Sequence, residues 1–161
     1  MKTNLFPFQF RVAISKDAEN VSALIALFAG DFIVNPDGSG AEQFLHSVSA
    51  QAEAGYIADP RYHFILAFAG EQLAGLIAMR DLAHLFHLFV HPDFQGRGLA
   101  TELWRRAHLH AVEHGHGNAH TVNSSLNAIP VYERFGFTAN GEVTVMHGIS
   151  FLPMRLQKQI S

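Results

Sequence analysis

Two glycines stand between an apolar run and a helical pattern in the segment 90–100, VHPDFQGRGLA. They are Gly96 and Gly98, at the point where the chain would enter the helix. Glycine lets backbone amides turn towards a ligand, and a helix amino terminus carries about half a positive charge. The segment therefore predicts a site for an anion such as a diphosphate, to which Arg97 could add a charged contact. It has neither the Lys-Ser/Thr pair of a P-loop nor a Gly-x-Gly-x-x-Gly pattern.

Histidine is the second residue type that could do chemistry here, because its ordinary pKa of about 6.5 lets it exchange a proton near pH 7. The chain has 11 histidines. His110 and His114 stand one helical turn apart and could share a metal ion, but no acidic third ligand lies at a suitable spacing. We therefore expect a solvated histidine-rich face, and no metal site, for His108, His110, His114, His116 and His120.

Cysteine is absent from the 161 residues. This excludes disulfides, Cys-ligated zinc and a mechanism that holds an acyl group on an enzyme thiol. The formal net charge is −3, from 11 Lys+Arg against 14 Asp+Glu. The broad basic surface of a nucleic-acid-binding protein is therefore missing, and we expect no nucleic-acid partner.

The elements that would position these residues follow from the apolar periodicity. It predicts one domain over residues 1–161, of mixed α/β (α+β) class. Strands are expected at 8–14, 62–69, 72–80, 83–90 and 119–123, and two more within 137–156. Helices are expected at 21–28, around 44–48, at 99–111 and at 128–135. The short gap after residue 69 predicts that the central strands form an antiparallel meander.

The sequence gives no sign of a membrane or secretory segment. The most apolar later stretch, 21–34, is interrupted by Gly30 and Asp31 and falls short of the roughly 18 residues that span a bilayer. Near the amino terminus, Pro7, Gln9 and Arg11 break the apolar run that a secretory signal needs. We expect a cytoplasmic protein with no membrane partner.

At this point the sequence resembles the GCN5-related N-acetyltransferase (GNAT) superfamily. The family's acetyl-CoA signature, Gln/Arg-x-x-Gly-x-Gly/Ala, is matched by Gln95, Gly98 and Ala100. The segment 127–137, NAIPVYERFGF, is similar to the family's Ala-x-x-x-Tyr-Glu-x-x-Gly-Phe helix. The resemblance implies a mixed, mostly antiparallel central sheet of about six to seven strands, flanked by about four helices.

The resemblance also implies the reaction, which is direct transfer of the acetyl group of acetyl-CoA to a primary amine in a ternary complex. Many relatives contact the pantetheine arm with an asparagine seven residues before the motif tyrosine. Here that position is Ser125, flanked by Asn123 and Asn127, so three residues are candidates for the contact. The cofactor-binding residues expected from the resemblance are Leu88, Phe89, Val90, Gln95, Gly96, Arg97, Gly98, Leu99, Ala100, Asn123 and Ser125.

The resemblance suggests catalytic roles for two further residues. Tyr132 resembles the family's general acid, whose phenol protonates the departing thiolate. His84, on the strand before the loop, lies where some relatives place a glutamate or histidine base. Simple strand alternation turns His87 to the opposite face, although a bulge of the kind usual in this family would reverse that. The base could therefore be His84, His87 or water.

The acceptor amine is not specified by any motif. In the family it is selected by the first two helices with their loop and by the last strands, here roughly 30–41 and 138–151. The acceptor is expected to be a small molecule or a peptide, and a homodimer is suggested by resemblance alone. A second hypothesis is a non-catalytic acyl-CoA-binding regulatory module, which would keep the loop but lack a working base.

Overall fold

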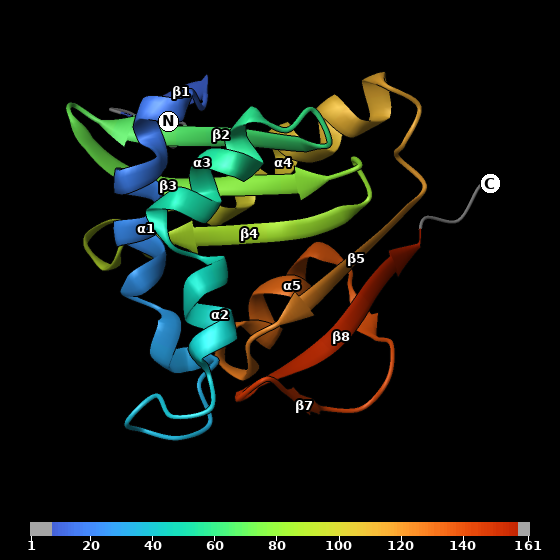
Figure 1. Cartoon of the computed structure of the whole chain (residues 1–161). Helices are drawn as coiled ribbons and strands as arrows, with labels where there is room; N and C mark the ends of the chain where they lie inside the picture. The colour runs from blue at the N-terminus through green and yellow to red at the C-terminus, as the bar shows by residue number, and fades with distance from the viewer. Residues whose placement is uncertain (1–7, 158–161) are drawn as a thin grey trace.

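The computed structural model describes residues 8–157 and contains an eight-stranded sheet (Figure 1). Its strands are β1 (Phe8–Val12), β2 (Tyr62–Ala69), β3 (Gln72–Arg80), β4 (His84–Val90), β5 (Ala119–Ser124), β6 (Thr138–Ala139), β7 (Thr144–Met146) and β8 (Ile149–Gln157). The order is β1-β2-β3-β4-β5-β8-β6, with β7 paired to β8. Among the described residues only β4 and β5 run parallel. The predicted mixed, mostly antiparallel sheet is confirmed.

Helices cover both faces of this sheet. They are α1 (Ala18–Ala26), α2 (Glu42–Ser47), α3 (Ala50–Ala58), α4 (Leu99–Glu113) and α5 (Ile129–Phe135). In Figure 1, α1 and α3 lie in front of the sheet and α4 lies behind it. No helix within residues 8–157 is long and apolar enough to cross a membrane.

The structure has one more helix and at least one more strand than the sequence analysis predicted. The additional helix is α3, which begins after Ser49, where the side-chain hydroxyl accepts a hydrogen bond from the Ala52 amide at 3.2 Å. Its first turns, AQAEAG, carry few large apolar residues, so periodicity gave no helix there. At the carboxyl end, the two expected strands are three, because the short β7 folds back on β8.

The sheet separates two apolar cores. The core on the α4 side includes Leu85, Val90, Leu103 and Trp104, and Tyr132 belongs to it. The core on the α1 and α3 side is formed by Val21, Ile25, Phe64, Leu66 and Leu76, against which Tyr56, Phe86 and Phe89 pack. The central strand β3 is buried along nearly its whole length because both cores press on it.

The parallel pairing of β4 with β5 is short. Only His84 with Thr121 and Leu85 with Val122 are in register. Beyond Leu85 the two strands diverge, so β4 continues to Val90 with no described strand along that edge (Figure 1). The hydrogen-bonding edge of β4 after Leu85 is therefore left unpaired by β5. The gap between the two strands provides the space for a site.

A bulge in β4 lies at the start of the divergence. Ala78 pairs with His87 and the next β3 residue, Met79, pairs with Leu85, which leaves Phe86 as the extra residue. As a result, Phe86 and His87 both contact the Tyr56 ring of α3, at centroid distances of 5.0 and 6.5 Å. Two adjacent β4 residues therefore share one face, which strict alternation would forbid.

Candidate functional site

A cavity of about 560 Å³ opens where β4 and β5 diverge. Its walls come from β4, the loop before α4, the end of β5 and α5. Most of the sequence-predicted site residues meet in this lining: Leu88, Phe89, Val90, Gln95, Gly96, Gly98, Leu99, Ala100, Asn123, Ser125 and Tyr132. Two of the predicted residues, His84 and Arg97, are not in it.

The loop before α4 is built to expose backbone amides. Gly96 and Gly98 both have a φ of +79°, in the left-handed region that glycine tolerates, and Gly98 caps the amino terminus of α4. The Gln95 side chain donates a hydrogen bond to the Val90 carbonyl at 3.0 Å, which ties the loop to the end of β4. This helix start can therefore receive a diphosphate through its free amides.

Arg97 departs from its expected role. Its guanidinium lies 5.4 Å from the centre of the Phe94 ring, in a cation–π arrangement, and it does not line the cavity. An anion contact by Arg97 therefore stays a prediction, whereas the loop offers its backbone amides to the cavity.

Tyr132 is placed by α5 between the core and the cavity. Its side chain is 6% exposed and packs edge-on against Phe135 and Phe137. Burial raises the pKa of its phenol well above the ordinary value, so the hydroxyl stays protonated at neutral pH. No described residue forms a hydrogen bond with it, so the O–H is available as a donor to a bound molecule.

The three candidates for the pantetheine contact all line the cavity. They differ in their partners. Asn127 donates its side-chain amide to Asp31 at 3.0 Å, across the cavity mouth. The side chains of Asn123 and Ser125 make no hydrogen bond with a described residue. The latter two therefore have free polar groups where the cofactor arm would pass.

His84 lies at the start of β4, where the strand is paired with β5. Its Nδ1 is 2.8 Å from the Thr121 hydroxyl. Burial, with a smaller contribution from the charge of Arg80, lowers the pKa of His84 to about 4. The ring is therefore neutral at pH 7 but a weak proton acceptor, and it does not line the cavity.

His87 does line the cavity, because the bulge in β4 redirects it. Its ring is 6% exposed and lies against Phe86, with centroids 4.3 Å apart. The Nε2 atom is 2.9 and 3.2 Å from the two carboxylate oxygens of Glu53, a residue of α3. Its Nδ1 makes no hydrogen bond with any described residue.

Glu53 is the site residue that the sequence analysis missed. It is fully buried, at 0% exposure, and belongs to α3, a helix that was itself not predicted. A signal was present in the spacing: Glu53, Tyr56 and Ile57 stand at i, i+3 and i+4, and the latter two pack into the core. A carboxylate on an apolar stripe requires a buried partner.

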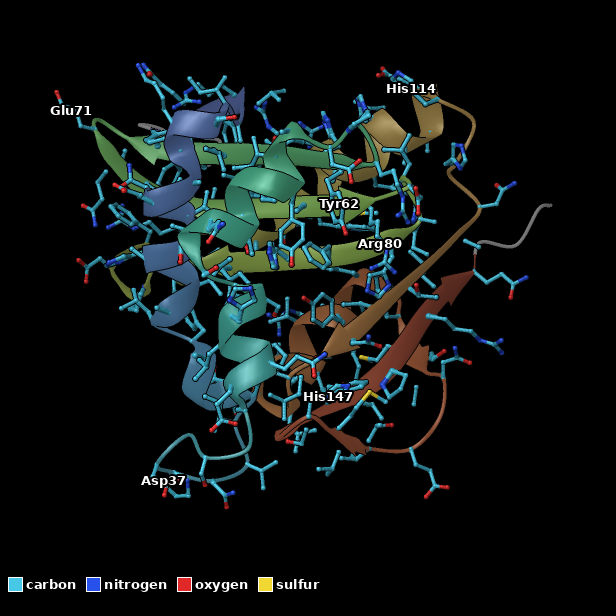
Figure 2. All side chains as sticks on the ribbon, in the orientation of Figure 1. Asp37, Tyr62, Glu71, Arg80, His114 and His147 are labelled. Atoms are coloured by element: carbon cyan, nitrogen blue, oxygen red, sulfur yellow. The ribbon has the colours of Figure 1, made fainter. Side chains whose placement is uncertain are left out.

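The histidine-rich region lies at the far end of α4. The rings of His63 and His110 stack with their centroids 3.8 Å apart, and the centroids of His110 and His114 are 4.2 Å apart. His114 is labelled at the end of this helix in Figure 2. No group of three His, Asp or Glu side chains within residues 8–157 is arranged to hold a metal ion. The expected solvated face is wrong for His120, which is 1% exposed and packs on Trp104, because β5 draws it beneath α4.

Comparison with known proteins agrees with the geometry. Residues 32–158 match the model of the acetyltransferase (GNAT) domain family. No curated protein matches the chain in sequence.

Three solved structures share the fold at low sequence identity. A GCN5-related N-acetyltransferase from Rhodopseudomonas palustris has a TM-score of 0.78 and 19% identity, covering 98% of this chain and 99% of its own. The PaiA N-acetyltransferase of Thermoplasma acidophilum, in complex with coenzyme A, has a TM-score of 0.73 and 17% identity, covering 95% and 100%. YncA of Salmonella typhimurium, a putative acetyltransferase with acetyl-CoA, has a TM-score of 0.69 and 19% identity, covering 96% of both chains. The family match spans most of the sequence and includes the loop, β5 and α5, so the chain belongs to the GNAT acetyltransferase domain family.

Proposed function

We propose that this protein transfers the acetyl group of acetyl-CoA directly to a primary amine of a small molecule or peptide, in a ternary complex. The observation that carries the proposal is the cavity at the β4–β5 divergence. It joins a helix start with free backbone amides, an unpaired strand edge and the side chain of Tyr132 in one space. Because the chain has no cysteine, no acyl-enzyme intermediate can form on an enzyme thiol.

The donor set fits coenzyme A. The loop amides at Gly96 and Gly98, with the amino terminus of the 15-residue helix α4, suit the diphosphate. The free edge of β4, at Leu88–Val90, suits the amide groups of the pantetheine arm, which would extend the sheet as a strand does. A backbone N–H of this edge would also polarise the thioester carbonyl.

Tyr132 would act as the general acid. The amine nitrogen attacks the thioester carbon, the tetrahedral intermediate collapses, and the carbon–sulfur bond breaks. The phenol O–H then gives its proton to the departing thiolate. The support for this role is the place of Tyr132 in the cavity lining, with a phenol that is protonated at neutral pH.

We assign the role of base to His87 in preference to His84. An alkylamine with a pKa of about 10.4 pays roughly 4.6 kcal/mol to be neutral at pH 7, so a proton acceptor near the amine would speed the reaction. His87 lines the cavity, whereas His84 lies outside it and its pKa is lowered to about 4. The proton lost by the amine would pass to His87 directly or through a water molecule.

The acceptor would enter between α1 and the start of α5. This part of the cavity is lined by Phe28, Phe32, Phe86 and Phe89, with Asp31 as its carboxylate. An amine that carries an apolar body suits these walls.

The test is an acetyl-CoA consumption screen that detects free thiol, across polyamines, amino acids, aminoglycosides and peptide amino termini. We expect thiol release with at least one class, and no release with acetyl-CoA alone beyond slow hydrolysis. Isothermal titration would measure acetyl-CoA binding in parallel. Binding without thiol release across the panel would contradict the proposal and favour a non-catalytic acyl-CoA-binding module.

A further inference from the structure

Glu53 is a fully buried carboxylate for which the reaction as described has no use. We propose that Glu53 is a positioning residue: its carboxylate accepts the Nε2–H of His87 and thereby presents the Nδ1 lone pair of that ring to the acceptor amine. The inference rests on the proposed function, because it assigns how the base of that reaction is oriented.

The hydrogen-bond geometry supports this assignment. Both Glu53 oxygens lie within hydrogen-bond distance of the same nitrogen, His87 Nε2, at 2.9 and 3.2 Å. In the proposed pair the carboxylate of Glu53 is the acceptor, so Nε2 carries the hydrogen. In the neutral imidazole the lone pair then belongs to Nδ1, which has no partner among the described residues, on a side chain that lines the cavity.

The surroundings of the pair resist any other orientation of the ring. His87 is enclosed by the rings of Phe86, Tyr56, Phe64 and Phe89, at centroid distances of 4.3, 6.5, 6.0 and 5.8 Å. Turning the ring over would point a C–H at a buried carboxylate and leave it unpaired, which is strongly unfavourable. The pair joins α3 to β4 across 34 residues of sequence, so its geometry depends on the packing of that helix.

The other buried carboxylate shows what a purely structural pair looks like. Asp17 binds Arg11 through two hydrogen bonds of 2.8 Å and accepts the Ile14 amide at 2.7 Å. Its partner is permanently charged, and neither residue lines the cavity. The partner of Glu53 is instead a group that can take up and release a proton next to the cavity.

A double-mutant cycle tests the proposal in the full chain. E53Q keeps the shape of the side chain, and H87Q removes the imidazole. We expect E53Q to lower kcat at least about tenfold, with KM for acetyl-CoA unchanged within about twofold, and to have no further effect in the H87Q background. D17N is the matched control: it should lower the melting temperature while kcat stays near that of the wild type.

Two results of this cycle would overturn the role of Glu53. One is an E53Q protein as active as the wild type. The other is a loss caused by E53Q that is equally large with and without His87. A wild-type protein that releases no thiol with any amine would instead contradict the proposed function, so the two failures are distinguishable.

A spectroscopic measurement keeps the test independent of activity and of the folding of E53Q. Long-range ¹H–¹⁵N spectra of the wild type report which nitrogen of each neutral histidine carries the hydrogen, and the His87 signals are those missing from H87Q. We expect the Nε2–H form for His87. Observation of the Nδ1–H form would overturn the proposal, because that ring would present a donor instead of an acceptor.

Discussion

The two ends of β4 carry one histidine each, in different surroundings. At the closed end, His84 and Leu85 pair with β5, and the His84 ring is held by the Thr121 hydroxyl. At the open end, residues 86–90 have no described strand partner on that edge, and His87 is held by Glu53 beside the cavity. The difference shows that the position along β4, past the bulge and the divergence from β5, decides which imidazole lines the cavity.

A second lesson concerns the partner of each ring. The hydroxyl of Thr121 is neutral and can act as donor or acceptor, so it does not select one ionisation state of His84. In the pair proposed above, the carboxylate of Glu53 accepts from Nε2 of His87, which would fix the nitrogen that carries the hydrogen. The histidines at the far end of α4, such as His63 and His110, contact mainly one another. Of the eleven histidines, all within residues 8–157, His87 is the one that lines the cavity.

The largest effect should come from the acid at the open end. Tyr132→Phe keeps the ring and its packing but removes the only proton of the side chain that can be transferred. We expect kcat to fall roughly 10²- to 10⁴-fold with KM for acetyl-CoA within about twofold. Steady-state kinetics at saturating acceptor measure this. Unchanged turnover would remove Tyr132 from the mechanism.

The contrast between the two histidines is tested most directly by paired substitutions. His87→Gln should lower kcat about 10- to 100-fold, because the proton acceptor beside the cavity is lost. His84→Gln should change kcat less than about threefold. Both are assayed with the same acceptor, and each is checked for folding by circular dichroism. The comparison of the two ends would fail if His84→Gln proved the more damaging.

The loop at the open end should affect cofactor binding more than chemistry. Gly98→Ala places a side chain at a φ of +79°, which costs about 1 kcal/mol of stability and distorts the first amides of α4. We expect KM for acetyl-CoA to rise about tenfold with kcat nearly unchanged, since binding energy at a remote group is lost equally in the ground and transition states. The matched control is Gly115→Ala, at a left-handed glycine of similar φ outside the cavity. A similar rise in that control would refute the explanation.

The smallest effect concerns stability at low pH. The folded pKa of His84 is about 4 against an ordinary 6.5, so between these values the unfolded chain binds a proton that the folded protein does not. The free energy of unfolding therefore falls as pH decreases from 6.5 to 4.

Removing His84 should flatten this dependence. For His84→Gln we expect the drop in melting temperature between pH 7 and pH 4.5 to shrink by roughly 4–8 °C, equivalent to about 2 kcal/mol. Differential scanning calorimetry measures it, with the surface residue His46 substituted as a control. An unchanged drop would show that His84 takes up its proton as readily in the folded protein.

Local patterns were sufficient for much of the fold. The runs at 62–69 and 72–80 became β2 and β3, because alternation and turn signals depend on neighbouring residues. The loop before α4 could also be predicted from the sequence, because its backbone conformation requires glycine at positions 96 and 98 whatever packs around it. In contrast, α3 was missed because its first turns are alanine-rich and its larger apolar residues, Tyr56 and Ile57, come only near its end.

The amino-acid sequence was enough to predict the glycine-rich loop before α4, the absence of an enzyme thiol and the place of Tyr132 in the site lining. Which histidine lines the cavity followed only from the folded chain. That depends on one extra residue in β4, which turns Phe86 and His87 to the same face, and on the packing of α3, which brings Glu53 to His87. Strand alternation is a local property, whereas a bulge and a contact across 34 residues are set by how helix and sheet fit together.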